Sequence, residues 1–160
     1  MKKKLLLPKS ARGQSLVELA VSLVILLYLL AGAAEFGIIF FQYVQLRDAA
    51  QEGALYGSIH PTEFALIEAR ARDSSASPIN LDVAPATTVK IYINDVLVRE
   101  NGVDKVAVVD VEDTACEANA VAVHVSYDHK IFMPFLPRVI GSIVPLNGIV
   151  TDTILTPVCP

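Results

Sequence analysis

Two carboxylates interrupt an apolar stretch near the start of the chain, and their surroundings limit the chemistry open to them. The sequence over residues 11–41 reads ARGQSLVELAVSLVILLYLLAGAAEFGIIFF, with Glu18 at the start of the apolar run and Glu35 near its far end. A charge in hydrocarbon is costly unless it is paired, neutralised or able to reach an interface. We expect Glu35 to lie near the far membrane interface, where it can snorkel or stay protonated. Glu18 must be accommodated at the other boundary, directly after an Arg-Gly-Gln tripeptide.

The remaining reactive side chains do not form a recognisable catalytic or metal site. The histidines and cysteines lack the spacing of a zinc site: His60, His124, His129, Cys116 and Cys159. The sequence contains no Gly-x-Ser-x-Gly, phosphate-binding loop or dinucleotide fingerprint. The acids at positions 110, 112 and 113 resemble a solvated strand end and are too few for a calcium loop. We therefore expect no enzymatic activity, no cofactor, no metal and no small-molecule substrate.

The two cysteines, Cys116 and Cys159, leave two states open. An even number of cysteines downstream of an export signal permits one disulfide in an oxidising compartment. Two free thiols fit the sequence as well.

The charges are distributed unevenly along the chain. Five of the 13 Lys and Arg residues precede the apolar run, with no acid among them: Lys2, Lys3, Lys4, Lys9 and Arg12. By the positive-inside rule this cluster places the N-terminus in the cytoplasm and exports the remainder. The exported part holds most of the 17 Asp and Glu residues, which gives no reason to expect nucleic-acid binding.

The apolar run is long enough to cross a membrane as a helix. Residues 16–41 would measure about 38 Å, more than the ~30 Å hydrocarbon core. A cleaved secretory signal is an alternative, with Ala31-Gly32-Ala33 as the small-residue site. Cleavage there would leave the apolar segment 36–43 at the start of a soluble chain, which disfavours it. A single-pass membrane protein is the favoured interpretation.

The helix is expected to continue beyond the membrane, because no proline occurs before Pro61. One face carries residues at spacings of three and four that become small distally: Tyr43, Leu46, Ala50, Gly53 and Gly57. Small residues let a partner helix or sheet approach closely. The other side carries polar residues: Gln42, Gln45, Asp48 and Glu52. The pattern predicts one helix over residues 14–58.

The exported segment, residues 59–160, is predicted to be an α+β domain. A short helix is expected over residues 62–73, with Thr62 as its N-cap. Period-two alternation and the Asn101-Gly102 turn signal predict antiparallel strands near 87–98 and 104–112. Further strands are expected at 120–128, with Val121, Val123, Val125 and Tyr127 facing the core and His124 facing the polar side, and at 148–156. The segment between them is expected to be irregular, and the sheet should pack on the exported half of the long helix.

The N-terminal motifs resemble those of a known family. The heptapeptide RGQSLVE is similar to a type IV prepilin processing site, with a basic leader, Gly13 at its end and Glu18 as the fifth mature residue. With the Glu-Phe-Gly triplet at 35–37 and AAQEGALYG at 49–57, it resembles the TadE-like minor pilins, or pseudopilins, of tight-adherence (Tad) pili. The resemblance covers the first 57 residues well and residues 121–156 loosely. The chain departs from the family pattern by having Ile38 after the triplet, and Gln51 and Leu55 beside the Glu-Gly pair, where arginines are common.

The resemblance implies a processing and assembly role. A prepilin peptidase would cut between Gly13 and Gln14, removing the cytoplasmic leader 1–13 and creating an amine on Gln14. Glu18 would pair with that amine on a neighbouring subunit and so set the axial register. The implied fold is pilin-like, with a long helix over 14–58, membrane-embedded over about 16–41, on a small antiparallel sheet. The implied partners are the prepilin peptidase, other Tad pilins, the secretion platform and the membrane.

Two questions stay open at the level of sequence. The chain could instead be a single-pass anchored surface domain that binds a ligand and is never processed. The apolar loop 131–137 could cover the sheet, or could form a patch for a neighbouring pilin or for the membrane surface.

Overall fold

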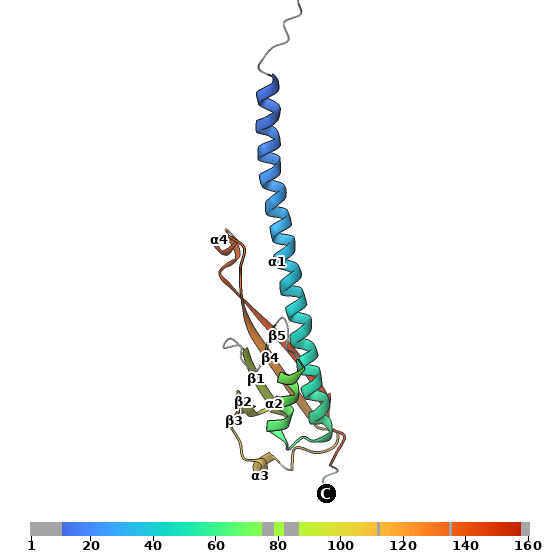
Figure 1. Cartoon of the computed structure of the whole chain (residues 1–160). Helices are drawn as coiled ribbons and strands as arrows, with labels where there is room; N and C mark the ends of the chain where they lie inside the picture. Colours follow the sequence, from blue (N-terminus) through green and yellow to red (C-terminus); the bar gives the residue numbers. More distant parts are fainter. Residues whose placement is uncertain (1–10, 75–78, 82–86, 112, 135, 158–160) are drawn as a thin grey trace, which may run out of the picture.

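One long helix runs the length of the molecule and carries a small domain on its C-terminal half (Figure 1). The computed structural model describes residues 11–74, 79–81, 87–111, 113–134 and 136–157. The long helix, α1 (Ala11–Ile59), has 49 residues and is therefore about 73 Å long. A second helix, α2 (Phe64–Asp73), and an antiparallel sheet pack against α1. The predicted α+β, pilin-like arrangement is confirmed.

The sheet has five strands in the order β3-β2-β1-β4-β5, and each neighbouring pair is antiparallel. The strands are β1 (Thr87–Ile93), β2 (Val96–Glu100), β3 (Val103–Asp104), β4 (Ala120–Lys130) and β5 (Ile143–Thr153). Two single-turn helices complete the fold, α3 (Val108–Val111) and α4 (Pro137–Ile140). The β4–β5 hairpin is the longest element of the sheet and extends along α1 toward its N-terminal half, with α4 at its tip (Figure 1).

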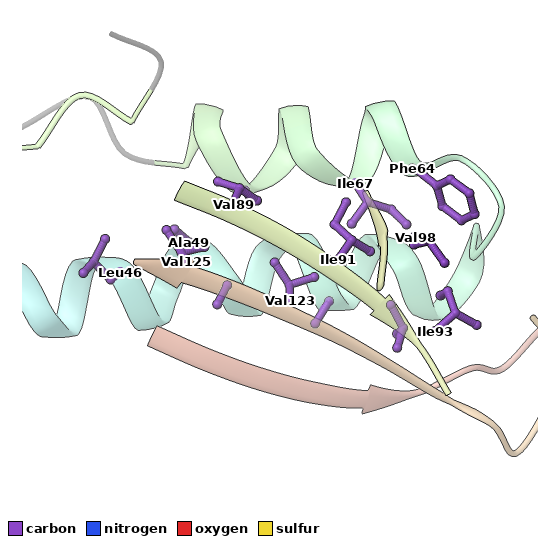
Figure 2. Close-up of a cluster of buried hydrophobic side chains, with 14 of the residues drawn as sticks. Leu46, Ala49, Phe64, Ile67, Val89, Ile91, Ile93, Val98, Val123 and Val125 are labelled. Atoms are coloured by element: carbon purple, nitrogen blue, oxygen red, sulfur yellow. The ribbon is translucent and has the colours of Figure 1, made fainter. Parts of the chain in front are cut away.

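Alternating apolar residues build the core on the sheet face that α1 and α2 cover. In the β1–β4 register, Val89 lies opposite Val125 and Ile91 lies opposite Val123. The buried apolar side chains of the strands meet those of both helices (Figure 2), among them Leu46, Ala49, Phe64, Ile67, Val89, Ile91, Ile93, Val98, Val123 and Val125. Burying one such large aliphatic side chain contributes about 1.5–3 kcal/mol. The predicted core face of β4 is confirmed at its three valines, and Tyr127 is half-buried.

Glycines allow the backbones of α1 and the sheet to approach closely, as the small-residue stripe predicted. A Cβ on Gly53 would lie 3.0 Å from the Ala71 Cβ, and one on Gly57 would lie 2.9 Å from the Val121 Cγ2. The tightest point is Gly148 on β5, where a Cβ would lie 2.5 Å from the Leu46 carbonyl carbon. The sequence did not single out Gly148.

The predicted faces of α1 need two corrections. Tyr43 is 41% exposed and does not belong to the packed stripe. Gln42 was expected on the outer side but is buried, and the Gln45 amide hydrogen-bonds the Ile79 carbonyl oxygen at 3.1 Å. The packed face is therefore centred closer to the glutamines than the apolar pattern indicated, because the segment around Ile79 lies against the helix there.

The strands predicted at 87–98 and 104–112 are wrong in their extent. Asn94 and Asp95 both have positive φ and form a tight turn that divides the first segment into β1 and β2. The Asn101-Gly102 turn is confirmed, but it joins β2 to the two-residue β3. The chain then leaves the sheet, since Val111 of α3 is needed to fill the core.

The last strand and the short helix also differ from expectation. β5 begins at Ile143 instead of 148 and ends at Thr153, because it pairs with β4 along the whole hairpin, past Pro145. Proline is tolerated there because β5 is an edge strand. Helix α2 begins at Phe64, so Glu63 and not Thr62 occupies the N-cap position.

Candidate functional site

Among the described residues, one helix is long and apolar enough to cross a membrane, and that helix is α1. Its N-terminal part is covered by few of the residues that the structure describes. Every described side chain between positions 13 and 30 is exposed, including the large apolar ones. A surface of this kind is stable in lipid but not in water, so α1 is a single-pass membrane anchor.

The predicted processing and register residues lie on the first turns of this exposed segment. Gly13, Gln14 and Glu18 are all helical and exposed. Gln14 and Glu18 are four residues apart and therefore share one face of the helix. Ser22 donates a hydrogen bond from its Oγ to the Glu18 carbonyl oxygen at 2.8 Å. Within the part of the chain that the structure describes, the Glu18 carboxylate has no hydrogen-bond or ion-pair partner.

The second carboxylate of the apolar run, Glu35, is buried and hydrogen-bonded within the chain. Glu35 is 1% exposed, and its Oε1 lies 2.9 Å from Nε2 of His129. The backbone N–H of Phe132 donates to the same oxygen at 3.0 Å. We call these three residues the Glu35 clamp. Of the two states that the sequence left open for Glu35, snorkelling needs an exposed carboxylate, whereas the β4–β5 hairpin covers this one.

A signal in the sequence could have found His129. It has the same strand parity as Val121, Val123 and Val125, so its side chain must point toward the helix side of the sheet. His124 has the opposite parity and lies against Tyr92 on the other face, with ring centroids 4.5 Å apart and the ring planes tilted by 38°.

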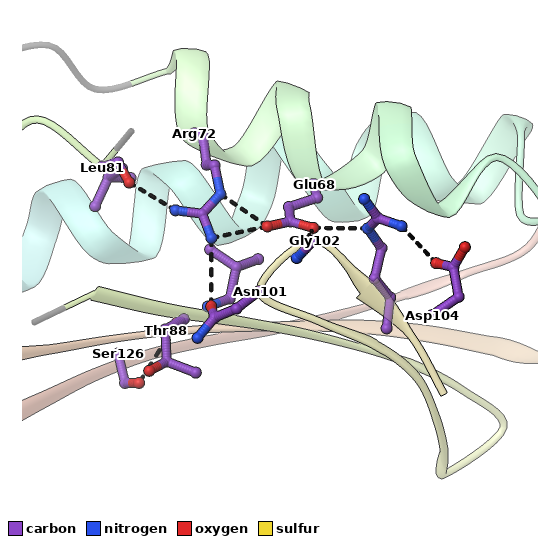
Figure 3. Close-up of polar contacts among 10 residues, drawn as sticks. Glu68, Arg72, Leu81, Thr88, Asn101, Gly102, Asp104 and Ser126 are labelled. Atoms are coloured by element: carbon purple, nitrogen blue, oxygen red, sulfur yellow. Dashed lines mark hydrogen bonds and ion pairs between the residues drawn. The ribbon is translucent and has the colours of Figure 1, made fainter. Parts of the chain in front are cut away.

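A buried ion network fixes α2 to the β2–β3 hairpin (Figure 3). Glu68 accepts hydrogen bonds from Arg72 at 2.8 Å, from Arg99 at 2.6 Å and from the backbone N–H of Gly102 at 2.8 Å. Arg99 also pairs with Asp104. Burial by itself raises the pKa of Glu68, but the two arginines and the Gly102 amide outweigh it and hold that pKa below its ordinary value. All members are engaged with one another, which suits a structural role and leaves no reactive group free.

The chain was compared with known protein families, curated proteins and solved structures. Residues 13–55 match the family model described as TadE-like protein. Over that segment the chain is TadE-like. No curated protein and no solved structure matches the chain.

The TadE-like segment contains Gly13, Gln14, Glu18 and Glu35 and ends just short of the C-terminus of α1. The match covers 43 of the 160 residues, so it describes the helical segment and not the sheet. The sheet, including His129 of the Glu35 clamp, lies beyond the match. The clamp therefore joins the TadE-like helix to a part of the chain for which no relative was found.

The two cysteines and the acids at 110, 112 and 113 lie partly outside the described residues. Cys116 is buried, and its neighbour Glu117 donates its N–H to the Pro157 carbonyl oxygen at 2.8 Å. Cys159 lies outside the described residues, so the pairing with Cys116 stays a prediction. Among the residues that the structure describes, no group of three His, Cys, Asp or Glu side chains could hold a metal ion.

Proposed function

We propose that this chain is a TadE-like minor pilin or pseudopilin that loses its leader to a prepilin peptidase and takes part in assembling a Tad-type pilus or secretion apparatus. The observation that carries the proposal is the exposed, lipid-length start of α1, with the Glu18 carboxylate unpartnered by described residues one turn from Gln14. The family match over residues 13–55 supports it.

The proposed cleavage lies between Gly13 and Gln14. A Cβ on Gly13 would meet nothing within 4 Å. The fold itself therefore does not require glycine there. A peptidase that binds an extended chain in a narrow site does favour glycine, because it has no side chain and little helix preference. Cleavage removes the basic cytoplasmic residues and leaves a new amine on Gln14.

The new amine gives Glu18 a partner. Two poorly solvated charges on adjacent subunits stabilise each other only in one relative position, as single buried polar groups do in coiled coils. The apolar side chains around Glu18 are exposed and can pack against neighbouring helices. Glu18 then sets the axial register, while the apolar surface supplies the packing energy.

The remaining parts of the proposal concern orientation and partners. The N-terminal cations hold the leader in the cytoplasm, where the peptidase acts, and the sheet is exported. Partners are the peptidase, the other Tad pilins, the secretion platform and the membrane.

N-terminal sequencing of the membrane-extracted protein tests the processing step. A processed pilin begins at Gln14, whereas an unprocessed, ligand-binding anchored domain begins at Met1 or Lys2. The variant G13L should retain the leader. G37L is the matched control, since a Cβ on Gly37 also meets nothing within 4 Å. An intact N-terminus in wild-type cells that express the peptidase would refute the proposal.

The register role is tested separately with E18Q, which removes the charge and keeps the shape. The variant should be processed and inserted normally but should be depleted from pilus or pseudopilus preparations. E52Q is the control, because Glu52 is an equally exposed acid on the exported part of the same helix. Equal incorporation of E18Q and E52Q would contradict the register role and leave the cleavage proposal standing.

A further inference from the structure

The end of the β4–β5 hairpin lies beside the membrane part of α1 and not over the sheet. We define the hairpin tip as residues 131–134 and 136–143, which follow the last residue of β4 and include α4 and Ile143, the first residue of β5. The N–H of Ile131 donates to the Ser142 carbonyl oxygen at 3.1 Å and closes its base. Figure 1 shows the tip far from β1, β2 and β3 and alongside the middle of α1.

Two sets of contacts fix the height of the tip on the helix. The Glu35 clamp holds Phe132 through its backbone N–H. Met133 and Pro134 line a shallow apolar groove with residues one to three turns further toward the N-terminus of α1, namely Val24, Leu27, Tyr28 and Ala31. The clamp therefore places the tip beside Glu35, and the groove runs from there past Ala31 toward Val24.

The part of α1 beside the tip lies within the hydrocarbon core of the membrane. If Glu18 marks the cytoplasmic edge of a core about 30 Å thick, about 20 helical residues cross it and the exported edge falls near position 38. Glu35 is then about 5 Å, and Ala31 about 10 Å, inside that edge. Monotopic elements typically bury their apolar face by about 5–10 Å.

The exposed surface of the tip is apolar, as insertion into lipid to this depth requires. Phe132 is 84% exposed, and Ile140 and Ile143 are about half exposed. On α1, the neighbouring Phe36 and Phe40 are also exposed and stack on each other. In water all of these apolar side chains would be exposed to solvent.

The cations near the tip are placed where they can reach the surface of the membrane. Lys130 ends β4 and Arg138 lies in α4, and both are exposed. Their long side chains can extend to lipid headgroups.

We propose that the hairpin tip inserts into the exported leaflet of the membrane, so that the protein holds the bilayer at two places, by α1 and by the tip. The tip is hydrogen-bonded to α1, so it shares the surroundings of the part of α1 between Val24 and Glu35. Because that part of α1 is surrounded by lipid, lipid also covers the exposed face of the tip. The inference requires only that α1 spans the membrane, and it does not depend on leader processing or on pilus assembly.

Insertion of the tip gives the exported domain a defined position. A single helix can rotate about its axis in lipid, but a second inserted element on one side of it restricts that rotation. The Glu35 clamp is the connection between the two elements, and the low-dielectric surroundings strengthen it.

The test uses the absence of tryptophan from the sequence, which makes F132W a unique fluorophore. Phe132 is so exposed that the substitution leaves the fold unchanged. The full-length protein is reconstituted into vesicles of phosphatidylethanolamine and phosphatidylglycerol, with and without lipids that carry bromine on their acyl chains. L27W, in the exposed part of α1, is the inserted reference, and L66W, on the exposed face of α2, is the reference in water.

We expect F132W to emit at shorter wavelength than L66W and to be quenched by the brominated lipids several-fold more strongly, close to L27W. Quenching no stronger than that of L66W would overturn the proposal. A blue-shifted emission without quenching by lipid would assign the tip to a protein contact and would overturn it equally. I140W repeats the measurement on α4, so that the result does not depend on one variant.

Discussion

The contact between Gly148 and α1 supports a quantitative prediction about how the sheet is held to the helix. A Cβ at this position would lie 2.5 Å from the Leu46 carbonyl carbon, 2.6 Å from its oxygen and 2.7 Å from the Arg47 nitrogen. All three are backbone atoms inside α1, so no side-chain rotation can make room. The variant G148A must push β5 away from the helix by about an ångström and open the core around Leu46.

Overpacking of a dense core lowers the free energy of unfolding by about 1–3 kcal/mol. Because backbone atoms cannot rotate away, we expect a loss of about 3 kcal/mol for G148A. For a domain of this size that loss lowers the midpoint of thermal unfolding by about 10–20 °C. G57A is the graded control. Its new methyl would meet only side-chain atoms of Val121 and Ile67, at 2.9 and 3.2 Å. Alanine also favours a helix over glycine by about 0.5–1 kcal/mol, so G57A should lose about 1 kcal/mol or less.

The assay is thermal unfolding of the full-length protein in detergent, followed by the strand signal in far-ultraviolet circular dichroism. We expect the order wild type, G57A, G148A in decreasing midpoint. A midpoint of G148A within about 3 °C of the wild type, a shift worth less than about 1 kcal/mol, would refute the packing of β5 on α1 described above.

Three further predictions concern single interactions. H129A leaves the Glu35 carboxylate buried without its imidazole partner and should lower the free energy of unfolding by about 2 kcal/mol, measured by chemical denaturation. The double variant E35Q/H129A should lose less than the sum of the two single variants. The pKa of Glu68 is lowered in the folded state, so its carboxylate contributes to folding stability above about pH 4.5, and this contribution is lost as the pH falls through the folded-state pKa. The variant E68Q should therefore be less stable than the wild type by about 2 kcal/mol at neutral pH, and this difference should shrink in acid. If Cys116 and Cys159 pair, non-reduced protein should have no titratable thiol in denaturant, whereas C116S should have one; two thiols in the exported wild type would contradict the pairing.

Local patterns were sufficient for much of the fold. The small residues Gly53 and Gly57 mark a helix face that another element approaches closely, and both lie at tight contacts. The alternation of Val89, Ile91 and Ile93 gives the correct buried face of β1 because strand parity is set by the backbone alone. The predicted strand boundaries were wrong where the sequence marks a turn only weakly, as at Asn94-Asp95. The alternation there suggests one strand, but two consecutive residues with positive φ divide it into β1 and β2.

Strand parity could place His129 on the helix side of the sheet, but no local signal identifies its distant partner. Glu35 and His129 are 94 positions apart, and only the length and register of β4 bring them together. The extension of β5 past Pro145 depends in the same way on its pairing with β4. Of the candidate sites, Gly13, Gln14 and Glu18 could be proposed from sequence because the proposed processing would act on a contiguous motif. The Glu35 clamp could not be proposed, because its geometry arises from tertiary packing.

The unbroken course of α1 has a mechanical consequence. No proline occurs between positions 11 and 59, and the helix passes from its lipid-facing half to its sheet-covered half without an interruption in its secondary structure. A force applied to the sheet therefore travels along one continuous ladder of backbone hydrogen bonds to the N-terminal end of the helix. Between positions 11 and 59 the helix gives the sheet no hinge on which to swing independently, so any tilt of the anchor is reproduced as a displacement of the whole sheet, enlarged by the length of the helix.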